Sequence, residues 1–424
     1  MLVYFLFFFY LFSGTILSQL IIRRKIFPFT IYHTATLVFF KVFMGCLYGW
    51  VFLHFYGGDD TWNYFNESKT ETDTLLQHPS VFIHEFTPAH SLLASNHQPL
   101  KAVLFYIVHF ERWFIIKGLG ILNLLSGKNY YIDVLLFEFL TIPGPLLLFK
   151  LLARAFPQRT GMNFLLIFFI PSVIFWCSGI RAEALILLSI VLLIYNGEAY
   201  ARKTSARSLI GIFAGFILIL LIRYQFLIVF LPAFFAYLIS VKKQIYTPVY
   251  FIRIVGFSLF LFGLSLFLPP AYQLSRPVQQ VQQNFLKLNG NTRYALDSLE
   301  PGPVSFIKIL PQAIGNSLLR PYPWEGKTLL QSLSSVDVLL MIFGLFYFIL
   351  CSNRKKQISH PLYWIFLFYG LSLLILIGYT VPFPGAIVRY RSISFLFLFL
   401  LLYAGNPLLQ QKRRLCSHSQ APAI

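Results

Sequence analysis

The feature that most constrains this chain is a series of uncharged apolar runs that recur from one end to the other. Each run has about 18 to 25 residues, the length that an α-helix needs to cross the hydrocarbon core of a bilayer. The runs do not alternate with period two, as strands of a membrane β-barrel would. Hydrophobic residues make up 57% and charged residues 12% of the 424 positions, too few charges to cover a soluble globule. We therefore predict an all-α polytopic membrane helix bundle of about 11 transmembrane helices.

The basic residues predict the orientation of these helices. The formal charge of +19 is concentrated in clusters just beyond apolar runs, so it fits the positive-inside rule rather than nucleic-acid binding. Placing all the clusters in the cytoplasm, with alternating crossings, puts the N-terminus outside and the C-terminus inside. The clusters are Arg23 to Lys25, Lys150 with Arg154 and Arg159, Arg202 with Lys203 and Arg207, Lys242 with Lys243, Arg354 to Lys356, and Lys412 to Arg414.

We predict one membrane domain over residues 1–424, with two long outer segments, 57–129 and 270–335. Within the first segment, residues 101–125 mix aromatic with charged side chains, which is typical of a helix lying along the membrane surface. We expect a helix from about 130 to 152 that is broken at Pro143 to Pro145. An outer hairpin is expected around residues 177–181, and a second outer turn near Arg223.

Asp59 and Asp60 follow two glycines where the helix of residues 31–56 is expected to leave the membrane on the outer side. Glycines allow a tight turn and a close approach of backbone to a ligand. A carboxylate there could act as a general base on a hydroxyl group or bind a divalent cation. The alternative is an ordinary polar turn that caps the next helix. No cofactor is certain from the sequence, and a divalent cation is possible.

Five arginines are expected at outer helix ends, against the positive-inside trend. Arginine presents a planar, permanently charged group that suits phosphate or carboxylate. As a set they predict a site for an anionic ligand at the interface, although each could instead reach lipid headgroups or pair with an outer acid, such as Arg181 with Glu183. The five are Arg181, Arg223, Arg320, Arg389 and Arg391.

The layout resembles the GT-C superfamily of integral-membrane glycosyltransferases: a helix that leaves toward the outer face, an acid at its exit, a long outer loop and many further spans. In more detail, residues 171–183, 320–325 and 388–391 are similar to elements of bacterial multi-span proteins of cell-surface polysaccharide synthesis. The first element of those proteins often has a basic residue directly before its acid, where this chain has Ala182 preceded by Arg181. The first helix is also an addition to the GT-C layout.

The resemblance implies a glycosyltransferase with a polyprenyl-phosphate or polyprenyl-diphosphate sugar donor, in the inner membrane of a bacterium and active in cell-envelope glycan synthesis. Asp59 or Asp60 would be the catalytic base, and a glycan or lipid would be the acceptor. A polysaccharide polymerase, a flippase or transporter of lipid-linked glycans and a noncatalytic scaffold are the alternatives. A transporter would use ionisable groups within spans, for which Lys41, Asp133 and Glu138 are the candidates. The residues expected to bind the lipid phosphate or the sugar are Arg181, Glu183, Arg223, Arg320, Trp324, Glu325, Arg389, Tyr390 and Arg391.

Overall fold

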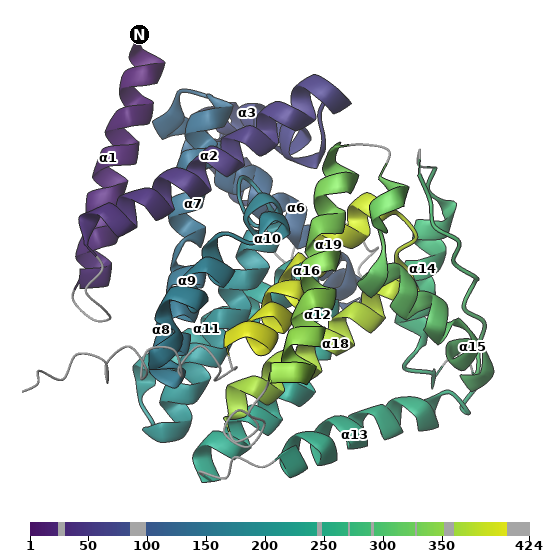
Figure 1. Ribbon diagram of the computed structural model, residues 1–424. Helices are drawn as coiled ribbons and strands as arrows, with labels where there is room; N and C mark the ends of the chain where they lie inside the picture. Colours follow the sequence, from purple (N-terminus) through teal and green to yellow (C-terminus); the bar gives the residue numbers. More distant parts are fainter. Residues whose placement is uncertain are drawn as a thin grey trace, which may run out of the picture. The chain divides into compact units, whose positions relative to one another are not determined.

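The computed structural model describes residues 1–23, 30–84, 99–243, 248–269, 272–289, 292–326, 329–351 and 360–404. The basic clusters at 354–356 and 412–414, and most of the cluster at 23–25, lie outside these residues. All regular secondary structure within the described ranges is helical (Figure 1), so the predicted all-α class is confirmed.

Nine helical stretches in the described part of the chain are long and apolar enough to cross a membrane. They support a multi-pass membrane protein. The stretches are Leu2–Leu20, Ile31–Tyr56, Tyr130–Ala155, Ala182–Arg202, Ala206–Lys243, Pro248–Ser265, Leu330–Leu350, Pro361–Thr380 and Pro384–Tyr403. They correspond to α1 (Leu2–Arg23), α2 (Ile31–Tyr56), α7 (Tyr130–Thr141) with α8 (Pro143–Ala155), α11 (Ala182–Arg202), α12 (Ala206–Lys243), α13 (Pro248–Ser265), α16 (Leu329–Cys351), α18 (Pro361–Thr380), and α19 (Pro384–Phe399) with η5 (Leu400–Ala404).

Two regions account for the difference from the predicted number of about eleven. Between η1 (Pro157–Arg159) and α11, the expected span consists of two short helices, α9 (Thr160–Phe168) and α10 (Pro171–Trp176). Pro171 begins the second of them, because proline lacks the N–H that would continue the first. The two spans expected on either side of Arg223 are counted together as α12, in which two helices meet at a kink where Arg223 has non-helical dihedral angles, φ −149° and ψ 74°.

The break predicted in the helix after residue 130 is confirmed, since α7 ends at Thr141 and α8 begins at Pro143. The two segments predicted to lie outside contain helices too: α3 (Asp60–Gln77), α4 (Pro79–His84) and α6 (Pro99–Ser126) in the first, and α14 (Arg276–Lys287), α15 (Pro303–Ile314), η3 (Gly315–Leu319) and η4 (Pro323–Glu325) in the second. Helix α6 contains the predicted surface helix of residues 101–125, and its place relative to a membrane stays a prediction.

The chain forms two compact units. Unit 1 consists of Met1–Lys150, Ile174–Leu193 and Ile210–Leu227, and unit 2 of Leu151–Val173, Ile194–Leu209 and Ile228–Ile424. Helices α8, α11 and α12 each contribute to both units, so the boundaries do not follow single elements. The single membrane domain expected over the whole chain stays a prediction.

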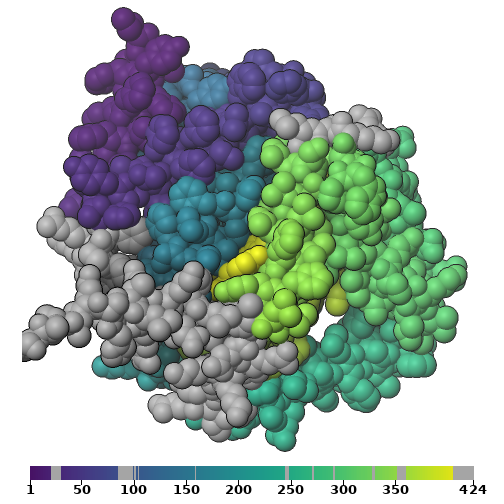
Figure 2. All heavy atoms as spheres, viewed as in Figure 1, coloured from purple at the N-terminus to yellow at the C-terminus, as the bar shows by residue number. Residues whose placement is uncertain are grey.

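In unit 1, an ion pair and side-chain hydrogen bonds connect α3 and α6. Lys117 lies 2.6 Å from Glu71, and Asn123 donates hydrogen bonds to Ser68 and Thr72. Helix α1 packs on α2 and α7, and Phe5, Phe8 and Phe12 on it are exposed. Figure 2 shows an uncovered face of the N-terminal segment, in purple. Such a face suits lipid rather than water.

Unit 2 has its core where α15, α18 and α19 pack together. A Cβ on Gly378 would come within 2.1 Å of the Ala313 carbonyl oxygen, so a glycine is required for this close approach. The Tyr379 hydroxyl donates to the Phe306 carbonyl at 2.6 Å. This packing fixes the base of the turn that follows α15, where the second group of expected site residues lies.

Candidate functional site

The link between α2 and α3 places the two adjacent aspartates. Gly57 and Gly58 have φ of 72° and 111°, in the left-handed region that favours glycine, so the glycine turn expected from the sequence is confirmed. Asp59 then acts as the N-cap of α3, and its side chain accepts hydrogen bonds from the backbone N–H groups of Thr61 and Trp62.

Asp59 is saturated with hydrogen bonds. One carboxylate oxygen accepts from the Thr61 backbone and hydroxyl, at 3.1 and 2.7 Å, and from Trp62 at 3.4 Å. The other oxygen accepts from the Tyr48 hydroxyl at 2.5 Å and from the Arg181 guanidinium at 3.0 Å. A carboxylate with five such donors is held in one position and has little capacity left to accept a proton from a substrate.

Arg181 reaches Asp59 from the turn before α11 and is only 2% exposed. Its guanidinium also donates to the Tyr48 hydroxyl and lies 4.7 Å from the centre of the Tyr48 ring and 5.3 Å from that of Trp176. Its Nε atom lies 3.4 Å from a carboxylate oxygen of the fully buried Glu183. The positive charge therefore faces two carboxylates within unit 1, while the buried Nε and Nη2 atoms make no hydrogen bond within the described residues.

Asp60 differs from its neighbour in that it is exposed. It occupies the first turn of α3, where the helix dipole favours a negative charge. Because Asp59 fixes the start of this helix, Asp60 is presented from a rigid support. Of the two adjacent carboxylates, Asp60 is therefore the one more accessible from solvent.

Arg223 is the other expected arginine of unit 1. It lies at the irregular position within α12, and its side chain, 26% exposed, pairs with Glu111 of α6 at 3.2 Å. The sequence predicted an outer helix end at this residue, and the interruption of helical geometry agrees with it in part. Its partial exposure leaves Arg223 more accessible to an anion than Arg181.

Unit 2 brings a second group of expected residues together around η4. Arg320 pairs with Glu325 at 3.0 Å, with side chains 29% and 23% exposed, and lies 4.5 Å from the centre of the Tyr294 ring. Burial and the nearby Glu325 raise the pKa of Tyr294 to about 12, so its hydroxyl stays protonated and can donate a hydrogen bond at neutral pH.

The other expected residues of unit 2 have differing surroundings. Arg391 is fully buried and donates to the backbone carbonyls of Ser317 and Arg320, which fixes the turn that holds Arg320. Arg389 and Tyr390 are half-buried neighbours, with the Arg389 guanidinium 5.4 Å from the Tyr390 ring. Trp324 is 80% exposed and stacks on Tyr322.

Within the described ranges, no group of three or more histidine, cysteine or acidic side chains is arranged to hold a metal ion. The divalent cation that the sequence leaves possible is not tested by this finding.

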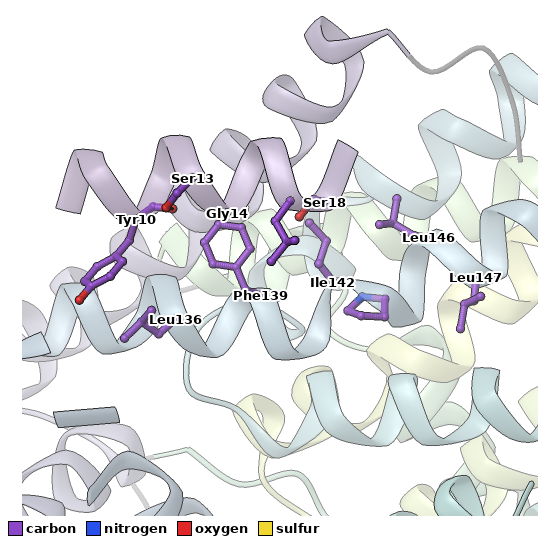
Figure 3. Close-up of a pocket in the computed structure, with 11 residues that line it drawn as sticks. Tyr10, Ser13, Gly14, Ser18, Leu136, Phe139, Ile142, Leu146 and Leu147 are labelled. Carbon is purple, nitrogen blue, oxygen red and sulfur yellow. The ribbon is translucent and has the colours of Figure 1, made fainter. Parts of the chain in front are cut away.

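A cavity of about 490 Å³ lies between α1 and the pair α7 and α8 (Figure 3). Leucine, isoleucine and phenylalanine side chains line most of it. The Tyr10 hydroxyl donates to the Leu125 carbonyl, and the Ser13 hydroxyl to carbonyls of its own helix. The lining has no charged side chain, so it does not suit a phosphate group.

Sequence reasoning missed three residues that shape these sites: Tyr48, Glu111 and Tyr294. Tyr48 lies 11 residues before Asp59 and is one of many aromatic residues in its span, so nothing in the pattern distinguishes it. Glu111 stands within an amphipathic stretch, and its partner Arg223 follows 112 residues later.

Comparison with protein-family models, with curated proteins and with solved structures finds no match for this chain.

Proposed function

We propose that this protein is a membrane glycosyltransferase that takes sugar from a polyprenyl-phosphate or polyprenyl-diphosphate donor at the outer face, for cell-envelope glycan synthesis. The observation that carries the proposal is the pair of adjacent carboxylates at the exit of a membrane helix. One, Asp59, is fixed by five hydrogen bonds, and the other, Asp60, is exposed beside it.

In this reaction the acceptor hydroxyl oxygen bonds to the anomeric carbon of the donor sugar. The bond from that carbon to the phosphate oxygen breaks, and the lipid phosphate departs with the electron pair. Asp60 takes the proton of the acceptor hydroxyl, which is the role of a general base. The assignment to Asp60 follows from its exposure, because the oxygens of Asp59 are occupied.

The departing phosphate needs a positive charge nearby, and such compensation is a large catalytic contribution in a site with little water. Arg223 in unit 1 and Arg320 in unit 2 are alternative candidates for this role, because each is partly exposed within its own unit. Arg181 and Arg391 are buried and act instead on neighbouring protein groups. The exposed Trp324 offers a flat apolar face on which a sugar ring could stack.

The test uses the full chain in lipid nanodiscs, with polyprenyl-phosphate hexoses offered in turn as donors and release of polyprenyl phosphate as the readout. Asp60→Asn should lower the rate by about 100-fold or more, with unchanged thermal unfolding. Asp60→Glu, which keeps the carboxylate, is the matched control and should retain part of the activity. Full activity of the double variant Asp59→Asn, Asp60→Asn would overturn the proposal.

A flippase for lipid-linked glycans is the second candidate, favoured by ionisable residues that lie fully buried within spans, Asp133 and Glu138. Proteoliposomes loaded with a fluorescent polyprenyl-linked sugar distinguish the two functions. A flippase moves the intact lipid across the bilayer, whereas a transferase separates the sugar from it.

A further inference from the structure

Two opposite charges lie buried within predicted membrane spans of unit 1. The Lys41 ammonium of α2 and the Glu138 carboxylate of α7 are 2.5 Å apart, with side chains 10% and 1% exposed. Charges at such a position are costly unless they are paired, and in membrane proteins they commonly mark ion pathways. Their further contacts indicate a different role here.

Both side chains also bond to the backbone of the turn between α10 and α11. Lys41 donates to the Cys177 carbonyl at 2.7 Å, and Glu138 accepts a hydrogen bond from the Gly179 N–H. Residues 177–181 are not helical, so these backbone groups lie outside the hydrogen-bond ladder of a helix. In a lipid environment an irregular backbone needs partners from the protein, and the ion pair supplies one for each group.

The fit between the turn and α2 is close. Gly179 has φ of 79°, and a Cβ on Gly45 would lie 2.7 Å from the Gly179 nitrogen. Two glycines therefore allow the turn to approach the helix that holds Lys41. The turn then leads directly to Arg181, whose N–H donates to the Gly179 carbonyl at 2.9 Å.

We infer that Lys41 and Glu138 are positioning residues, which fix the turn of residues 177–181 and, through Arg181, hold Asp59 and the start of α3. A chain of contacts joins the buried pair to the turn, the turn to Arg181, and Arg181 to Asp59. The pair holds protein backbone and does not carry a transported ion. Only the consequence for catalysis at Asp60 rests on the proposed function.

Cys177 provides a test that does not depend on sugar transfer. It is buried in the turn itself, and its carbonyl is the group that Lys41 holds. In a background of Cys46→Ser, Cys351→Ser and Cys416→Ser, it becomes the single thiol of the chain. Its reaction rate with a water-soluble maleimide in nanodiscs then reports how often the turn opens.

We expect Lys41→Met and Glu138→Gln each to raise the labelling rate of Cys177 by about tenfold or more, because local opening becomes easier. Asp133→Asn is the matched control, since it removes another fully buried carboxylate of α7 that has no hydrogen bond to the turn within the described residues. It should leave the rate unchanged. Size-exclusion profiles in detergent identify any variant that fails to fold, and Glu138→Gln, which keeps an acceptor for Gly179, is the milder of the two.

The double variant Lys41→Met, Glu138→Met separates positioning from simple charge balance. It has no uncompensated charge but leaves the Cys177 carbonyl and the Gly179 N–H without their partners, so labelling should stay fast. Labelling as slow as in the parent, in the double variant or in both single variants, would overturn the inference. Because no donor or acceptor is present, this failure is distinct from a failure of the proposed transferase activity.

Discussion

The Arg181–Asp59 pair of unit 1 and the Arg320–Glu325 pair of unit 2 have the same nitrogen-to-oxygen distance, 3.0 Å, and each arginine lies over a tyrosine ring. They differ in burial, with side chains 2% and 13% exposed in the first pair and 29% and 23% in the second. They differ also in span along the sequence, 122 residues against five. The distance alone therefore does not identify a binding site. Burial indicates a structural role for the first pair, whereas the second is accessible to solvent.

The largest effect on stability is expected when the Arg181–Asp59 pair of unit 1 loses its arginine. Arg181→Ala removes the cation that pairs with Asp59 and Glu183 in a largely buried environment, so the free energy of unfolding should fall by about 3–5 kcal/mol. Thermal unfolding in detergent, followed by intrinsic fluorescence, measures the change. A loss of stability no greater than that of Arg320→Ala would remove the distinction between the two pairs.

Much of unit 1 follows from its sequence. Continuous apolar runs predict α1 and α2, the two prolines near residue 143 predict the break before α8, and the paired glycines predict the turn before Asp59. These features depend on local properties of the chain, which are the ones that a sequence shows. The division of residues 160–176 into two short helices was not predicted, because the run there is uncharged throughout and only Pro171 marks its interruption.

The residues of the candidate sites could be predicted from the sequence, but the contacts between them could not. The sequence indicated Asp59 and Arg181 separately, each from its place at an expected helix end. It gave no means to pair them across 122 residues, or to tell that Tyr48 would join them, because such contacts depend on how helices pack. The same holds for the different surroundings of Asp59 and Asp60, which are adjacent in the chain and opposite in exposure.

Unit 2 contains a half-buried titratable group, His360, that sharpens the comparison because it is held in its neutral form. Burial lowers the pKa of His360 to about 4 from an ordinary value of 6.5. Its ring accepts a hydrogen bond from the Leu362 N–H at the start of α18. The unfolded chain takes up a proton first as the pH falls, so the stability due to this group is full above pH 6.5 and is lost between 6.5 and about 4.

The contribution of His360 to the free energy of unfolding changes by about 3 kcal/mol between pH 6.5 and about pH 4. His360→Asn keeps a helix-capping acceptor without a titration in this range, so its melting temperature should fall less between pH 7 and pH 4 than that of the parent protein. Scanning fluorimetry of both proteins in one buffer series measures the difference, and parallel pH profiles would contradict it.

The smallest effect on stability is expected for the partly exposed Arg320–Glu325 pair of unit 2. Under the proposed function, however, loss of this pair should affect sugar transfer. Arg320→Ala should change the free energy of unfolding by no more than about 1 kcal/mol, because partly exposed ion pairs contribute little. Under the proposed function the same variant should slow transfer more than the exposed Arg293→Ala, a control with the same change of charge in the same unit. If Arg320→Ala destabilises the protein as much as Arg181→Ala, both pairs are structural, and the phosphate site must be sought at Arg223. If the two unit 2 variants transfer sugar equally well, overall charge rather than the Arg320–Glu325 pair attracts the donor.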